Sequence, residues 1–197
     1  MKYVSFKIIQ THIITRTKPT FKYRGKVIIL HDTIHPLFID YCSYFNGNQD
    51  FFECHEVLEE LWKEIAPGDK QHALVGLIQV ATSMYHWRRG NFRGAEKAMK
   101  SAIDIVRATY DSLYAAYIDF QQLASDCDDT LARMKQGASF QYFKLIFSDE
   151  TFKLAVETQI RTLPQLEPEF LMHKHTLRDR SEVIAARAAR LAEKKRF

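Results

Sequence analysis

The 197-residue chain is 46% hydrophobic and 13% aromatic, which is enough for a packed core and excludes wholesale disorder. No apolar run approaches the roughly 18 residues that a membrane span requires, and the N-terminus lacks the pattern of a secretory signal, so we expect a cytoplasmic protein without a membrane segment. The net charge of +4 combines a body of −8, residues 31–172, with two basic ends, and such a body lacks the electrostatic footprint of a nucleic-acid-binding domain.

The first thirty residues differ in character from the rest of the chain. They carry a charge of +7 without one acidic residue, and they are rich in β-branched residues that show no helical periodicity. We expect short strands or a loose arm here. A start codon upstream of the functional chain, which would then begin between residues 30 and 35, explains this composition equally well, so we assign the arm no function.

From His35 onward the apolar spacing is helical. The pattern predicts helices at about 36–45, 51–66, 70–89, 93–125, 128–136 and 149–161, with Asp50 and Asp69 as the N-caps of the second and third. "TLPQLEPEF" interrupts the pattern with two prolines, and a basic helix is expected from Arg178. The fold class is therefore all-α: a compact antiparallel helical bundle over residues 31–165, followed by a basic C-terminal segment over 166–197.

Three scattered cysteines, Cys42, Cys54 and Cys127, fit this picture of an intracellular bundle. Their odd number and irregular spacing are typical of buried thiols in a reducing compartment. They do not form the pattern of a disulfide framework or of a zinc knuckle.

The helix that contains "FFECHEVLEELW", residues 51–62, carries the candidate site. At about 100° per residue, most of its acids, Glu56 among them, cluster opposite the apolar arc as a solvated face. His55 and Glu59 belong to neither group and lie one helical turn apart. We therefore expect this pair to point inward. It is either a buried His–Glu hydrogen bond that fastens two helices or half of a metal or acid–base site.

"HEVLE" also resembles the zincin signature H-E-x-x-H. The second histidine of that signature is replaced by Glu59, and the expected general base, Glu56, is predicted to face solvent. A zincin-type protease is therefore disfavoured, because its motif needs both histidines on one metal-facing side.

The next helix, predicted over 70–89, is apolar except for one stripe. The stripe consists of His72, Gly76, Gln79, Ser83 and His86. If the short Pro67-Gly68 connection forms an antiparallel hairpin, Gln79 lies level with His55, Gly76 leaves space beside Glu59, and Ser83 and His86 lie further along. We therefore expect Gln79, Ser83 and His86 to contribute to ligand binding, and His72 to lie at the surface. The alternative is that the whole stripe faces water.

Two stretches resemble a known family. "FNGNQDFFECHEVLEELWK" and "LVGLIQVATSMYHWRRGNFRGA" are similar to the bacterial and archaeal domain-of-unknown-function family 309, and "HKHTLRDRSEVIAAR" is similar to the tail of its Bacillus-type members. The resemblance implies a compact all-helical fold and no established activity. Its signature positions carry no assigned role; they are His55, Glu56, Leu58, Glu59, Trp62, Gly76, Gln79, Gly90, Asn91, Gly94 and Ala95.

Three functions remain in competition. The first is a bundle that binds a small ligand or a divalent metal such as Zn²⁺, Mn²⁺ or Fe²⁺; as an enzyme it would be a metal-assisted hydrolase, with Glu59 as ligand or base and His55 as ligand or acid. The second is a structural or adaptor bundle in which His55 and Glu59 form a buried polar lock. The third, disfavoured, is an RNA-associated protein that acts through its basic ends. The apolar side of the C-terminal segment suits docking on the body or on a second copy in a homo-oligomer.

Overall fold

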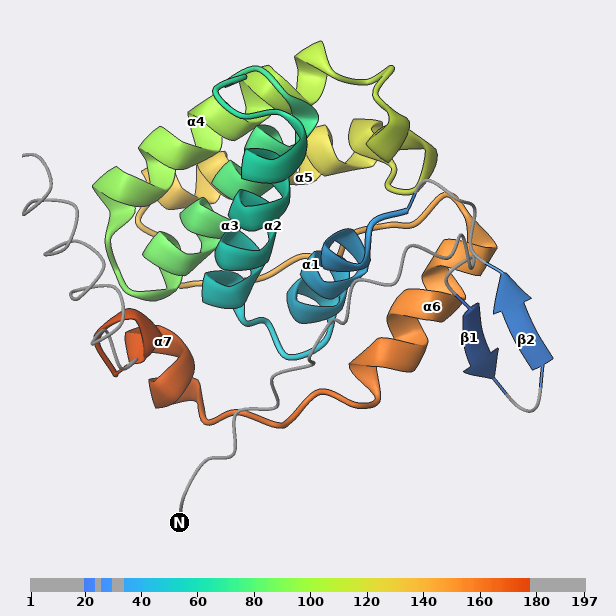
Figure 1. The fold of residues 1–197 in the computed structure, drawn as a ribbon. Helices are drawn as coiled ribbons and strands as arrows, with labels where there is room; N and C mark the ends of the chain where they lie inside the picture. The colour runs from blue at the N-terminus through green and yellow to red at the C-terminus, as the bar shows by residue number, and fades with distance from the viewer. Residues whose placement is uncertain (1–19, 24–25, 30–33, 178–197) are drawn as a thin grey trace, which may run out of the picture. The chain divides into compact units, whose positions relative to one another are not determined.

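A computed structural model of the chain describes residues 20–23, 26–29 and 34–177 (Figure 1). Contacts divide the chain into two units, residues 1–33 and 34–197. In the first unit, strands β1 (Thr20–Tyr23) and β2 (Lys26–Ile29) form an antiparallel hairpin in which Thr20 lies opposite Ile29.

The second unit is built from helices, which confirms the predicted fold class. They are α1 (Pro36–Asn46), α2 (Phe51–Ile65), α3 (Ala73–Arg88), α4 (Phe92–Ala108), the 3-10 helix η1 (Leu113–Ala116), α5 (Phe120–Lys135), α6 (Glu150–Ile160) and α7 (Pro168–Leu177). Helix α3 packs against both α2 and α4, α1 packs against α2 and α6, and α5 packs against α4 (Figure 1). Within the described residues, no helix combines the length and the apolar character that crossing a membrane requires.

Local capping explains where α2 begins. Asp50 is its N-cap, as the sequence predicted, and the Asp50 Oδ1 atom accepts a hydrogen bond of 3.1 Å from the Glu53 backbone N–H. Asp69 does not cap α3, which corrects our expectation. It accepts instead from the Gln71 N–H in the preceding turn, and His72 caps α3 by accepting from the Leu74 N–H through Nδ1.

The long helix predicted over 93–125 is interrupted, because α4 is followed by η1 and then by α5, and α5 also contains most of the separate helix predicted at 128–136. Helix α4 ends at Ala108, where the Thr109 hydroxyl donates to the Ile105 carbonyl, and α5 starts after Asp119, whose carboxylate accepts from the Gln122 N–H. Apolar periodicity continues through the break, but these side-chain bonds to the backbone compete with helix continuation. The interruption predicted at the two prolines is present between α6 and α7, but it ends earlier than expected, because Pro168 already starts α7. The basic helix expected from Arg178 lies outside the described residues.

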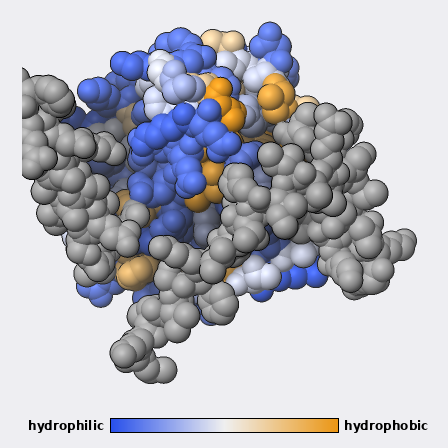
Figure 2. Space-filling model, in the orientation of Figure 1, coloured by the Kyte–Doolittle hydropathy of each residue, from blue (hydrophilic) through white to orange (hydrophobic). Residues whose placement is uncertain are grey.

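Aromatic side chains and thiols fill the interior. The Phe38 and Phe152 rings of α1 and α6 stack at 5.3 Å, and the Trp87 indole N–H donates to the Ala138 carbonyl at 3.1 Å. All three cysteines are buried and free, as predicted, and burial raises the pKa of the Cys42 and Cys54 thiols. On the coloured part of the face drawn in Figure 2, hydrophilic residues predominate and hydrophobic residues form small separate groups.

The α3 stripe does not face solvent along its whole length. A Cβ atom at Gly76 would lie 3.1 Å from the Ile105 Cγ2 atom, so Gly76 lets α4 approach α3 and does not leave space beside Glu59 as we expected. Ser83 is fully buried on the same side, and its hydroxyl donates to the Ala95 carbonyl at 2.7 Å. These two positions are contacts between α3 and α4.

Helix α7 is held against the body by polar contacts. The ammonium group of Lys174 forms ion pairs with Asp50, which is 1% exposed, and with Glu53, at 2.9 Å from Oε1. The Tyr85 hydroxyl lies 2.9 Å from the His175 Nδ1 atom. Asp50 therefore caps α2 with one carboxylate oxygen and binds α7 with the other.

This dual role predicts that Asp50→Ala lowers the free energy of unfolding by about 2 kcal/mol or more, because it removes an N-cap and leaves a largely buried cation with one partner fewer. Asp119→Ala, which removes an N-cap alone, should lower it by about 1 kcal/mol. Urea denaturation measures both. Equal losses in the two variants would contradict the dual role.

Candidate functional site

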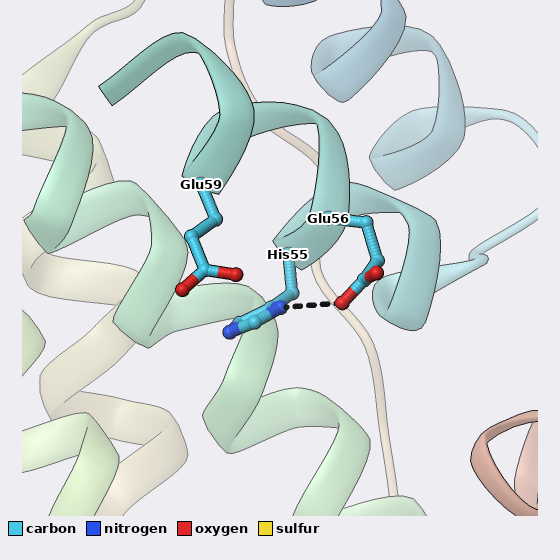
Figure 3. Close-up of side chains that lie close together, drawn as sticks. All are labelled: His55, Glu56 and Glu59. Atoms are coloured by element: carbon cyan, nitrogen blue, oxygen red, sulfur yellow. Dashed lines mark hydrogen bonds and ion pairs between the residues drawn. The ribbon is translucent and has the colours of Figure 1, made fainter. Parts of the chain in front are cut away.

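Three potential metal ligands gather on α2. His55, Glu56 and Glu59 each offer a ligand atom, and these atoms all lie within 4.8 Å of one another. In Figure 3 the imidazole lies between the two carboxylates, and the Glu56 Oε1 atom is 3.3 Å from the His55 Nδ1 atom. Within the described part of the chain, this is the one group of three or more His, Cys, Asp and Glu side chains close enough together to share an ion.

The cluster is half-buried, which corrects the expected sequestered His55–Glu59 pair. The side chains of His55, Glu56 and Glu59 are 35%, 34% and 36% exposed. Glu56 is also corrected: although the wheel directs it to solvent, its long side chain folds back to the imidazole. The Glu59 Oε1 atom lies 3.1 Å from the exposed ammonium group of Lys63, one turn further along the helix.

The cluster borders a cavity of about 500 Å³ between α2, α3 and α4. His55 and Glu59 line it from α2, and Gln79 lines it from α3. Ser101 and Asp104 line it from α4, and they are site residues that the sequence analysis missed. The sequence gives little indication of their position, because polar residues on α4 also form the solvated face of that helix. The short connection between α2 and α3 thus brings an imidazole, a carboxylate and an amide to one hollow.

Ser83 and His86 lie elsewhere. Ser83 is sealed between α3 and α4 by its bond to Ala95. His86 lies at the end of α3, where its Nδ1 atom is 3.1 Å from the Asn91 side-chain nitrogen, and burial together with the charge of Arg89 lowers the pKa of His86. Neither residue lines the cavity that His55 and Glu59 line.

These features define a class: an all-helical bundle with a half-buried His/Glu cluster beside a cavity. The family model described as "Domain of unknown function (DUF309)" matches residues 38–98, a range that contains the whole cluster. The "Uncharacterized protein YpuF" of Bacillus subtilis (strain 168) is 33% identical over 166 residues, which cover 81% of this chain and 95% of the Bacillus protein. No solved structure matches the chain significantly. The chain belongs to the domain-of-unknown-function family 309.

The exposure of the cluster predicts that it contributes little to folding. His55→Ala should lower the free energy of unfolding by less than about 1 kcal/mol, because partly exposed ionic contacts are weak. Urea denaturation of the variant and of the unmodified protein measures this difference in the free energy of unfolding. A loss of several kcal/mol would instead support the structural lock.

Proposed function

We propose that this protein binds a divalent metal ion through His55, Glu56 and Glu59. The observation that carries the proposal is the convergence of three ligand atoms within 4.8 Å of one another on one helix. One imidazole and two carboxylates form a donor set that suits Zn²⁺, Mn²⁺ or Fe²⁺. Mn²⁺ is the most practical probe, because it coordinates carboxylate oxygen and its binding can be measured by calorimetry.

Access to the cavity supports a site that keeps open coordination positions. His55 and Glu59 line the cavity, so an ion between them would present its remaining positions to that hollow. A metal with three protein ligands and open positions is the usual arrangement of catalytic sites. The reaction class that we propose is hydrolysis, in which the ion supplies Lewis-acid activation. Gln79, on the opposite wall, is placed to orient a bound molecule through its amide.

One existing contact competes with the ion. Lys63 pairs with the same Glu59 carboxylate that would bind the metal, yet the Lys63 side chain is 60% exposed. Exposed ion pairs are worth about 0–1 kcal/mol, so release of Lys63 costs little.

Lys63→Ala should therefore tighten metal binding by about twofold to fivefold, because it removes both the competing pair and a nearby positive charge. Isothermal titration with Mn²⁺ measures the change. Lys97→Ala, an exposed lysine on α4, is the matched control and should leave the affinity unchanged. Weaker binding in Lys63→Ala would contradict the competition between Lys63 and the ion for Glu59.

The direct test removes the ligands. His55→Ala and Glu59→Gln should each weaken Mn²⁺ binding by more than about tenfold, since loss of a ligand should exceed the cost of losing a supporting hydrogen bond. Glu60→Gln, an exposed acid on the same helix, is the control and should bind Mn²⁺ as the unmodified protein does. Equal affinity in all three variants would refute the proposed site.

A further inference from the structure

We propose that the cavity beside the metal site binds a small organic acid whose far end carries no net charge. Its acid group would coordinate the ion, and its hydrocarbon stem would lie on the apolar lining. This inference rests on the proposed metal site, because the acid group needs the ion as its partner.

The size and lining of the cavity fit a molecule of this kind. About 500 Å³ lies within the range of small-molecule sites, which is roughly 300–1,000 Å³. Val75 and Ile78 from α3 and Ile105 from α4 supply the apolar lining, and Trp62 supplies an aromatic one from α2. His55 and Trp62 are seven positions apart, so the cavity extends for about 10 Å along α2.

The end at His55 is suited to an acid group. Gly76 faces Ile105, and Ser83 bonds to Ala95, so α3 and α4 run antiparallel. In that register Gln79 lies nearly level with Ser101, and both line the cavity. An amide and a hydroxyl therefore lie where they can donate hydrogen bonds to a carboxylate that binds the ion.

The end at Trp62 discriminates against a second charge. The Trp62 indole N–H donates to the Asp69 carbonyl at 2.8 Å, which fixes the ring against the turn that holds Lys70. Lys70 and Asp104 both line the cavity and are both exposed. Ile105 faces Gly76, which lies on the Lys70 side of Gln79. Asp104 is next to Ile105 in the sequence, so Asp104 lies toward the end of the cavity that holds Lys70. Because Asp104 offsets the charge of Lys70, a second carboxylate gains no net attraction there to balance the hydration that it loses on entering the cavity.

The test uses the full-length protein loaded with Mn²⁺, titrated with octanoate and with octanedioate. Calorimetry reports binding, and the fluorescence of Trp62 reports occupancy of the cavity, because the other tryptophan, Trp87, is buried. Octanoate should bind the Mn²⁺-loaded protein at least about tenfold more tightly than the metal-free protein. Octanedioate should bind about threefold more weakly than octanoate. Trp62→Phe should abolish the fluorescence change and retain the calorimetric signal.

Asp104→Asn tests the neutral end and should remove the preference for octanoate over octanedioate. Asp111→Asn is the control: Asp111 is exposed and does not line the cavity, so this variant should keep the preference. If Mn²⁺ binds and octanoate does not, or if octanoate binds equally without Mn²⁺, the acid-binding inference fails and the metal site stands. If octanedioate binds more tightly than octanoate, the neutral end is wrong. If Mn²⁺ does not bind, both proposals fail.

Discussion

Helix α3 is buried along most of its length because Gly76 lets α4 approach on one side while α2 packs on another. Every polar side chain on such a helix must find a partner or border a hollow. Ser83 finds its partner in the Ala95 carbonyl. Gln79 instead borders the cavity, opposite His55. The close approach of α4 therefore decides which part of the polar stripe packs between the helices and which part borders the cavity.

Polar groups at successive turns of α2 have different surroundings. Its N-terminal end is structural, because Asp50 and Glu53 bind Lys174 of α7 and hold that helix to the body. One turn later, His55, Glu56 and Glu59 converge while remaining half-exposed. Glu56 and Glu59 place two carboxylates beside one imidazole, so a shared cation is the partner that we propose for the cluster.

Local signals explain what could be predicted from the sequence. Asp50 caps α2 through a contact three residues away, and Gly47 follows the last residue of α1, so both boundaries are readable without knowledge of the tertiary structure. The inward position of Gln79 followed from the short connection between α2 and α3. The all-helical class followed from a periodicity that continues through most of the chain.

The features that the sequence did not predict depend on the conformational freedom of side chains or on contacts between residues far apart in the chain. A helical wheel places the Cβ atom of Glu56 toward solvent, but a long side chain can fold back, and its carboxylate reaches His55. Docking of the C-terminal segment on the body was one expectation, but the ion pair that holds α7 joins Lys174 to Asp50, 124 positions away, and no local pattern predicts that pair. Ser83 and His86 shared a stripe with Gln79, but only the placement of α4 shows that they lie outside the cavity.

The central claim is that an ion is shared by His55, Glu56 and Glu59. The most direct measurement is a crystal structure of the protein soaked in Mn²⁺, with anomalous diffraction data collected to locate the ion. We predict an anomalous peak within direct coordination distance of a His55 ring nitrogen and a Glu59 carboxylate oxygen. Anomalous peaks confined to other carboxylates, with His55 still paired to Glu56, would contradict it.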